Sequence, residues 1–377
     1  MRVAVLKERR GGETRVAATP ETVKKYLGLG LEVAVERGAG LASGITDAAY
    51  AEAGAEIAPD AAAALAGAGI VLKVRAPEPA ERAAIPRGAL LIGTLGADAE
   101  AAAAYAAAGI DACAMELLPR ITRAQSMDVL SSQANLAGYR AVIEAAAAYD
   151  KAFPMMMTAA GTVPAANVFV MGAGVAGLQA IATARRLGGR VSATDVRPAA
   201  KEEIKSLGAS FVGYEDEESR AAQTEGGYAR QLSAAFYAKQ AEVVGAHIAK
   251  QDVVICTALV QGRKAPTLVT EAMVAAMRPG SVIVDIAADA GGNCALTKPG
   301  EVVVTENGVK ILGHTNWPGR LPAAASALYA RNLLTFLTTF WDKEAKAPRL
   351  PEEDEIVKGV TLTRGGAVVH PLMKPAA

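Results

Sequence analysis

The chain has 377 residues, which is longer than one hydrophobic core usually grows, so two domains are expected. Hydrophobic residues make up 51% of it but aromatic residues only 5%, which indicates a core of Ala, Val, Leu and Ile between helices and a parallel sheet. Lys plus Arg equals Asp plus Glu at 39 each, so no overall charge attracts a nucleic-acid backbone or an anionic membrane, and no nucleic-acid partner is expected.

The first part of the chain alternates short apolar runs with Ala-rich stretches. A strand is predicted over Arg2 to Leu6, and Thr19 followed by Pro20 predicts a helix start, because Thr caps helices well and Pro fits their first turn. Further strands are predicted at 31–37, 70–75 and 89–95. This alternation predicts a domain of βα repeats.

A second set of strands follows a helical segment at 133–149. These strands are predicted at 167–171, 190–195, 210–214, 252–258, 281–287 and 301–313, which is the number that a dinucleotide-binding sheet needs. Residues 322–341 are predicted to form a long helix that returns the chain to the first domain, and a hairpin is predicted in the terminal segment. We therefore predict an α/β protein with two Rossmann-like, doubly wound parallel-sheet domains. The first is discontinuous (1–135 and 320–377) and the second is inserted (136–319).

One uncharged stretch, from Ala152 to Ala184, is long enough to cross a bilayer. Pro154, Pro164 and several glycines interrupt it, so we predict a loop, a buried strand and a helix start there instead. The charged residues 7–10 lie where a signal peptide needs its apolar stretch. Three cysteines without disulfide spacing fit a reducing cytoplasm, and three histidines without ligand spacing predict no metal site.

Gly172, Gly174 and Gly177 form a G-x-G-x-x-G motif directly after an apolar strand and directly before an Ala- and Leu-rich helix. The first glycine permits a tight turn, the second lets the backbone approach a pyrophosphate, and the third allows helix and strand to pack closely. Asp195 ends the next strand, 18 residues after Gly177, where a carboxylate can bind ribose hydroxyls and repel a 2′-phosphate. The motif therefore predicts NAD(H) rather than NADP(H), a discrimination that Arg197 could soften. The alternative is a Gly-rich turn without a ligand.

The predicted cofactor-binding residues of this region are Gly172, Ala173, Gly174, Val175, Ala176, Gly177, Asp195, Val196 and Arg197. Thr257, Ala258 and Leu259 are added because they end the strand at 252–258, where such sheets contact the cofactor. Asp289 and Asn293 either line the nicotinamide side or cap a turn, and the sequence leaves both open.

VMGAGVAGLQAIATARRLGGRVSATDVRP at 170–198 and LLPRITRAQSMDVLSSQANLAGYRAV at 117–142 make the chain recognisable. With VDIAADAGGNC and ASALYARNLL, they resemble the NAD(H)-binding component of the proton-translocating nicotinamide nucleotide transhydrogenase family, from end to end. The chain is similar, more loosely, to alanine dehydrogenases. The resemblance implies an alpha subunit that transfers hydride directly between NAD(H) and the NADP(H) bound by a partner subunit. It also implies a homodimer, a transmembrane proton-channel partner subunit, and a cytoplasmic protein that is peripheral on the cytoplasmic face of the inner membrane.

The segment from Pro119 to Ser131 resembles the Arg-Gln-Asp loop of transhydrogenases. The resemblance implies that Arg120, Gln125, Asp128 and Ser131 surround the nicotinamide and its ribose. Asp128 can accept from the carboxamide and pair with Arg120, while Gln125 can reach a second nucleotide. Direct transfer needs two nicotinamides held roughly 3 to 3.5 Å apart and no acid or base. The alternative is an ordinary ion pair between Arg120 and Asp128 at a helix start.

An amino-acid dehydrogenase of the alanine type is the competing function. In that family an Arg, a Lys and a His handle the substrate, and their positions fall on Arg15, on Arg75 and on or near Gly96. An Arg with a pKa above about 12 is no base, and Gly has no proton to give, so this function is disfavoured.

The polar stretch from Glu215 to Arg230 is similar to the family's mobile loop. This similarity implies a lid in which Tyr228 folds over bound nucleotide; a solvated surface loop is the alternative.

Overall fold

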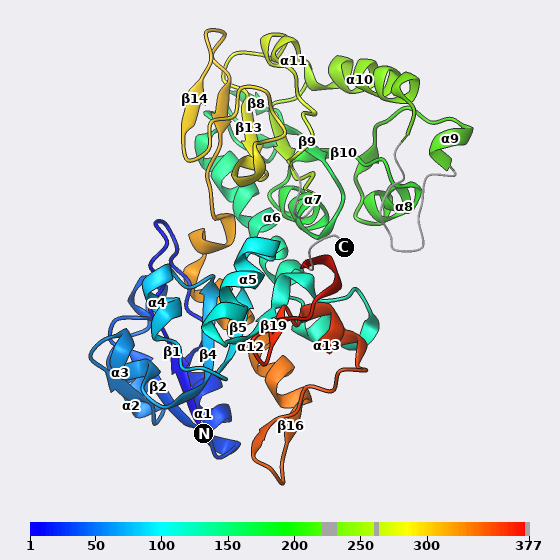
Figure 1. Cartoon of the computed structure of the whole chain (residues 1–377). Coiled ribbons are helices and arrows are strands. Elements are labelled where there is room, and N and C mark those ends of the chain that lie inside the picture. The colour runs from blue at the N-terminus through cyan, green and yellow to red at the C-terminus, as the bar shows by residue number, and fades with distance from the viewer. Residues whose placement is uncertain (221–231, 260–263, 374–377) are drawn as a thin grey trace. The chain divides into compact units, whose positions relative to one another are not determined.

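The computed structural model describes residues 1–220, 232–259 and 264–373, and Figure 1 traces them along the chain. The chain divides into two compact units. Unit 1 comprises Met1–Gln133 and Gly319–Ala377, and unit 2 comprises Ala134–Pro318. Unit 1 is therefore formed by both ends of the chain, with unit 2 inserted between them.

The described strands of the unit 1 sheet pair in parallel, in the order β3-β2-β1-β4-β5-β6. β1 lies between β2 and β4, so the strand order reverses there as in a Rossmann fold. The strands are β1 (Arg2–Val5), β2 (Glu32–Glu36), β3 (Glu56–Ala58), β4 (Ala68–Arg75), β5 (Leu90–Thr94) and β6 (Asp111–Ala114). β3 and β6 are additions to the strands that the sequence predicted.

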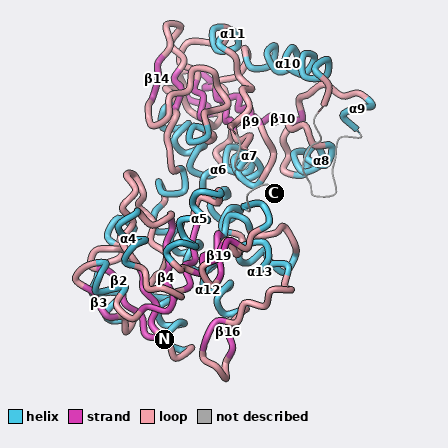
Figure 2. The backbone as a smooth tube through the Cα atoms, viewed as in Figure 1, coloured by secondary structure: helices cyan, strands magenta, loops and turns pink. Residues whose placement is uncertain are grey.

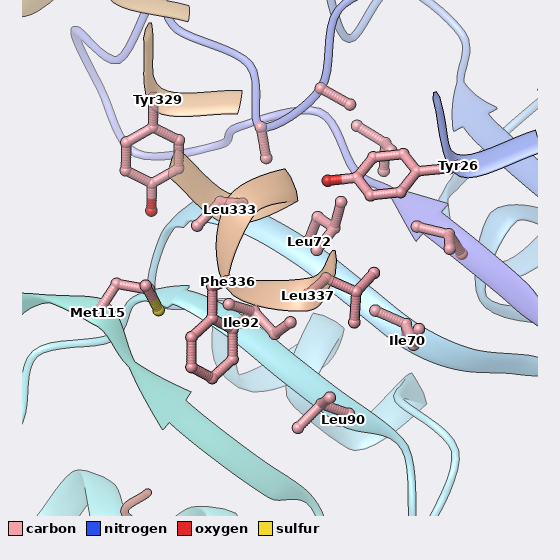
Figure 3. Packing of buried hydrophobic residues seen from close by; sticks show 14 of the residues in the cluster. Tyr26, Ile70, Leu72, Leu90, Ile92, Met115, Tyr329, Leu333, Phe336 and Leu337 are labelled. Atoms are coloured by element: carbon pink, nitrogen blue, oxygen red, sulfur yellow. The ribbon is translucent and has the colours of Figure 1, made fainter. Parts of the chain in front are cut away.

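The helices of unit 1 cover this sheet and fill its core. They are α1 (Pro20–Gly28), α2 (Asp47–Glu52), α3 (Ala61–Leu65), α4 (Pro79–Ala84), α5 (Ala99–Ala108), α12 (Pro322–Thr339) and α13 (Glu355–Val360). Thr19 caps α1 and Pro20 begins it, as predicted. Figure 3 shows Phe336 and Leu337 of α12 packed among Ile70, Leu72 and neighbouring side chains of the sheet, in one buried cluster. The predicted long helix from the C-terminal segment is therefore part of the unit 1 core.

Two short strand pairs complete unit 1 near its end. They are β16 (Trp341–Asp342) with β17 (Ala347–Pro348), and β18 (Thr363–Arg364) with β19 (Ala367–Val368). The second pair is the hairpin predicted for the terminal segment.

The sheet of unit 2 has the order β11-β10-β9-β12-β13-β15-β14. Its strands are β9 (Asn167–Met171), β10 (Arg190–Thr194), β11 (Ser210–Phe211), β12 (Val253–Cys256), β13 (Val282–Asp285), β14 (Val302–Val304) and β15 (Lys310–Leu312). β14 pairs antiparallel with β15, so the one strand predicted over 301–313 is wrong. The Asn-Gly pair at 307–308 turns the chain back, and Gly308 has the positive φ that such turns require. The described remainder of the sheet is parallel.

The helices α6 (Val129–Ala148), α7 (Val175–Arg186), α8 (Pro198–Ser206), α9 (Glu217–Arg220), α10 (Ala234–Ile248) and α11 (Glu271–Ala275) follow in chain order. α6 carries the chain from unit 1 into unit 2. Figure 2 shows strands of this unit between helices such as α7 and α10. Both units therefore have the predicted Rossmann-like α/β fold.

The predicted loop after Ala152 contains a small hairpin of β7 (Met156–Thr158) and β8 (Gly161–Val163). The buried strand and helix predicted beyond it are β9 and α7. Among the helices described, none combines the length and the apolar character needed to cross a membrane.

Candidate functional site

The carboxyl ends of β9, β10 and β12 meet where the strand order of the unit 2 sheet reverses, which is where such sheets bind ligands. Gly172 follows β9 with a φ of 101°, a conformation that favours glycine. Gly174 is the N-cap of α7, and a Cβ on it would meet nothing within 4 Å. A Cβ on Gly177 would collide with the carbonyl oxygen of Gly172. The turn is thus open at the helix N-terminus and tightly packed behind it, which suits a pyrophosphate.

The carboxylate of Asp195 is fixed beside this turn. Its Oδ2 accepts a hydrogen bond from the Ala173 backbone N–H at 2.7 Å, and its Oδ1 accepts from the Arg197 backbone N–H at 2.8 Å. The Arg197 side chain also donates from Nε to Oδ1 at 3.0 Å, and this hydrogen bond raises the pKa of Arg197 above its usual value. The side chain of Asp195 is 9% exposed. A ribose that binds Asp195 must therefore share the carboxylate with the Arg197 guanidinium or displace it.

A cavity of about 140 Å³ opens beside Asp195 and Arg197. Gln240 of α10 frames it: its Nε2 donates to Thr194 Oγ1 at 2.9 Å, and its Oε1 accepts from the Tyr214 N–H at 2.6 Å. The rings of Tyr214 and Phe236 lie 5.7 Å apart, centroid to centroid. The lining residues include Val196, Pro198, Phe211, Tyr214, Phe236 and Gln240. The cavity is therefore partly aromatic, and the sequence did not predict Tyr214, Phe236 or Gln240.

The segment after β12 approaches the glycine turn from the other side. Thr257 Oγ1 donates to the Gly172 carbonyl oxygen at 3.0 Å. Ala258 is held by Asn293, whose Oδ1 accepts from the Ala258 N–H at 3.1 Å and whose Nδ2 donates to the Ala258 carbonyl at 2.9 Å. The side chain of Leu259 is exposed. Two of the predicted residues, Thr257 and Ala258, therefore lie at the same edge as the fingerprint.

Asn293 is fully buried, and its role in the described structure is to hold the backbone. Its N–H donates to Asp285 Oδ2 at 2.7 Å, and this buried carboxylate also accepts from Cys294 N–H and Thr297 Oγ1. Of the two alternatives left open by the sequence, this geometry favours turn capping for Asn293. Asp289 likewise accepts from a backbone N–H, that of Asn316, at 2.9 Å. Asp285 was missed, although an acid that ends an apolar strand is the same signal that identified Asp195.

The loop that ends in Ser131 belongs to unit 1. Its centre is the 3-10 helix η3 (Thr122–Met127), with Ala124 and Met127 buried and Gln125 exposed. Asp128 Oδ1 accepts from the Ser131 N–H at 2.9 Å, and Ser131 Oγ donates to Asp128 Oδ2 at 2.5 Å. Arg120 lies exposed ahead of η3. The structure thus brings Asp128 and Ser131 together at the start of α6 and presents Gln125 on the surface of unit 1.

Arg15 and Arg75 share one carboxylate at the carboxyl edge of the unit 1 sheet. Glu13 Oε2 lies 2.7 Å from Arg15 NH2 and 2.9 Å from Arg75 Nε, and Arg15 NH1 donates to Gln133 Oε1 at 2.9 Å. Burial alone would raise the pKa of Glu13, but the hydrogen bonds and charges of the two arginines outweigh it and lower the pKa to about 2. Gly96 has a φ of 66°. The arginines at two positions that handle substrate in alanine dehydrogenases are therefore engaged by Glu13.

A second buried ion cluster lies behind these arginines. The Lys73 ammonium group, whose side chain is 1% exposed, lies 3.4 Å from Glu8 Oε2 and 3.3 Å from Glu81 Oε1. Burial raises the pKa of Glu8 despite the charge of Lys73. Lys73 is therefore held between carboxylates and is a structural ion-pair partner.

Tyr228, the residue expected at the centre of the lid, lies outside the described residues. The segment before it is described as far as α9, where Glu215 pairs with Lys201 at 2.6 Å.

Comparison with known families decides where the chain belongs. The alanine dehydrogenase/PNT N-terminal domain matches residues 4–137, and the alanine dehydrogenase/PNT C-terminal domain matches residues 141–371. The chain belongs to the alanine dehydrogenase/PNT family. Within this family it is 55% identical to the first of the chains that make up NAD(P) transhydrogenase subunit alpha in Rhodospirillum rubrum, over 99% of both chains.

Two further members of the alanine dehydrogenase/PNT family show to which branch the chain is more similar. A crystal structure of transhydrogenase from Sinorhizobium meliloti is 54% identical, with a TM-score of 0.88 over 98% of this chain and 100% of that one. Alanine dehydrogenase of Bacillus subtilis is 31% identical over 86% of this chain and 82% of its own length. The chain is thus a homologue of transhydrogenase subunit alpha, an oxidoreductase subunit, and alanine dehydrogenase is the more distant relative. The resemblance predicted from the sequence is confirmed.

Proposed function

We propose that the chain is the NAD(H)-binding component of a proton-translocating transhydrogenase. In this proposal hydride passes directly between NAD(H) on this chain and NADP(H) on a partner subunit, while a transmembrane partner subunit carries the protons. The observation that carries it is the glycine turn at the head of α7 with the Asp195 carboxylate fixed beside it. The relationship to transhydrogenase subunit alpha supports the same function.

The proposed path of NAD(H) follows the edge of the unit 2 sheet. The pyrophosphate would lie at the open N-terminus of α7, near Gly174. Asp195 would accept from the hydroxyls of the adenosine ribose, and its negative charge opposes a 2′-phosphate. The cavity lined by Tyr214 and Phe236 offers aromatic surfaces to the adenine ring. Thr257, Ala258 and Leu259 would approach the nicotinamide half.

The proposed role of the η3 loop is to orient the nicotinamide. Arg120, Gln125, Asp128 and Ser131 bring amide, hydroxyl and charged groups that can bind a carboxamide and a ribose. In the reaction, C4 of NADH gives up a hydride, which is a proton with two electrons, and C4 of NADP⁺ receives it. No proton is released, so a side chain that acts as acid or base is not needed. What these residues must supply is position, because transfer needs the two rings at roughly 3 to 3.5 Å.

The proposal is tested by mixing the purified chain with its NADP⁺-loaded partner subunit and NADH. Formation of NADPH at the expense of NADH is the expected result. Binding of NADH without hydride transfer would leave only a nucleotide-binding module and overturn the proposal. The chain alone, given NADH, ammonia and 2-oxo acids, is expected to be inactive because Glu13 engages Arg15 and Arg75. Reduction of a 2-oxo acid would establish the dehydrogenase instead.

Gln125 provides a residue-level test of the loop. Gln125→Asn shortens the exposed side chain by one methylene, and we expect slower hydride transfer with an almost unchanged Kd for NADH, because Gln125 is assigned to the second nucleotide. The matched control is Thr122→Ala, an exposed position on the same turn. A large loss of NADH affinity in Gln125→Asn would contradict this assignment.

We further propose that the chain acts as a homodimer on the cytoplasmic face of the inner membrane, bound to its partner subunits. The support is that the R. rubrum relative is named as a portion of a transhydrogenase subunit. Light scattering of the purified chain tests the dimer, and a monomer at micromolar concentration would contradict it.

A further inference from the structure

Asn332 is a buried polar residue on α12, a helix whose other inward side chains are largely apolar. Its side chain is 7% exposed, and its neighbours Leu333 and Phe336 belong to the unit 1 core. Nδ2 of Asn332 donates to the carbonyl oxygen of Ser126 at 2.8 Å, and Oδ1 accepts from Ser132 Oγ at 2.7 Å. Both ends of the amide are therefore bound to the segment that contains η3 and the start of α6.

The two partners of Asn332 lie on either side of the residues assigned to the nicotinamide. Ser126 follows Gln125 directly, and Ser132 follows Ser131. Ala124 and Met127 anchor the same turn in the core, but apolar contacts are not directional. A hydrogen bond to the Ser126 carbonyl is directional, so it fixes the orientation of the backbone between Gln125 and Asp128.

The amide of Asn332 also continues a chain of hydrogen bonds. Ser132 Oγ accepts from Gln133 Nε2 at 3.3 Å, and Gln133 Oε1 accepts from Arg15 at 2.9 Å. Arg15 in turn is held by Glu13. Because each group is held by the next, Ser132 is a fixed point for Asn332.

We infer that Asn332 is a positioning residue for hydride transfer, which acts through the Ser126 carbonyl to hold Gln125 and Asp128 in place. The inference rests on the proposed function, since it gives the η3 loop a rigid support for the role proposed there. A side chain that only stabilised the unit 1 core would affect folding and transfer together. A positioning residue affects transfer beyond its effect on folding.

The test compares Asn332→Leu, which keeps the volume and removes both hydrogen bonds, with Leu337→Ala about one turn further along α12. Leu337 is buried in the same core but has no polar group that could hold the Ser126 carbonyl, so Leu337→Ala lowers Tm as a control for stability. Three quantities are measured: Tm, the Kd for NADH of the chain alone, and the single-turnover rate of NADPH formation with the NADP⁺-loaded partner subunit at saturating NADH. Ser132→Ala, which keeps the bond to Ser126, is the third variant.

For Asn332→Leu we expect a transfer rate reduced about 10-fold or more, with the Kd for NADH changed less than about 2-fold. Leu337→Ala should transfer hydride at the wild-type rate per folded molecule, and Ser132→Ala should lose much less than Asn332→Leu. If Asn332→Leu does not fold, Asn332→Ala gives the same comparison. A wild-type rate in the Asn332 variant, or an equal loss in Leu337→Ala, would overturn the inference. Failure of the wild-type chain to transfer hydride would instead overturn the proposed function.

Discussion

At the scale of single residues, Glu13 shows how burial and charge compete for one carboxyl group. Its side chain is 1% exposed, which by itself disfavours the charged form. Arg15 donates to it from the side chain and from the backbone, and Arg75 adds a second positive charge. The result is a pKa lowered from 4.5 to about 2, so the carboxylate stays charged over the whole neutral range.

This lowered pKa predicts how stability depends on pH. Because the pKa is lower in the folded than in the unfolded chain, the contribution of Glu13 is complete above about pH 4.5 and is lost as the pH falls toward 2. Glu13→Gln should therefore reduce the free energy of unfolding by about 3 kcal/mol at pH 6, and the difference from wild type should shrink between pH 4.5 and 2. Urea unfolding followed by circular dichroism across this range measures it.

The control for this prediction is Glu56→Gln, which removes an ion pair between Arg2 and an exposed carboxylate. Exposed pairs contribute little, so this variant should follow the wild-type curve. A difference between Glu13→Gln and wild type that is the same at pH 3 and pH 6 would contradict the assigned pKa.

Residues of the fingerprint could be predicted because their signal is local. Gly172, Gly174 and Gly177 adjoin a strand and a helix in sequence, and Asp195 ends the next strand. Asn332 could not be predicted, since its partner Ser126 is 206 positions away and nothing near it in the sequence marks the contact. The cavity residue Gln240 was missed for the same reason, because its partner Thr194 lies on a distant strand.

At the scale of elements, burial decides which strands the sequence reveals. β9 and β12 are almost wholly buried and appear as continuous apolar runs. β3 is short and largely exposed on its first residues, and β7 is exposed throughout, so neither has an apolar pattern to detect. The Asn-Gly turn between β14 and β15 was in the sequence, but the long run of valines around it favoured one strand.

Helices α6 and α7 approach closely at Gly138, where a Cβ would collide with the backbone of Ala176 in the first turn of α7. Gly138→Ala should therefore shift this turn, lower stability by about 1 to 3 kcal/mol, and weaken NADH binding, because the turn is the proposed pyrophosphate site. Calorimetric titration with NADH and urea unfolding measure both effects.

Gly245 of α10 is the matched control for this element. A Cβ there meets only Met273 at ordinary van der Waals distance, so Gly245→Ala should stabilise the helix by about 0.5 to 1 kcal/mol and leave NADH affinity unchanged. Equal behaviour of the two variants would refute the close approach of α6 and α7.

At the scale of the whole molecule, the two units depend differently on the order of the chain. Unit 2 is one continuous segment, whereas unit 1 needs the C-terminal segment, because Leu333, Phe336 and Leu337 of α12 are at most 1% exposed in its core. The apolar pattern of 322–341 revealed α12 in the sequence. Which core it fills was an inference from the α/β pattern, since apolar periodicity shows that a face is buried but not against what.

This difference predicts the behaviour of two fragments. A fragment of residues 129–318 keeps α6 and the whole unit 2 sheet, so it should unfold cooperatively and bind ADP-ribose as the full chain does. A fragment of residues 1–318 lacks α12, and its unit 1 should expose apolar surface that binds a dye such as ANS. Because Arg120, Gln125 and Asp128 belong to unit 1, the full chain should prefer NADH to ADP-ribose, whereas fragment 129–318 should bind both alike. A fragment 129–318 that retained the full preference for NADH would show that the η3 loop does not bind the nicotinamide, since that loop would be missing from it.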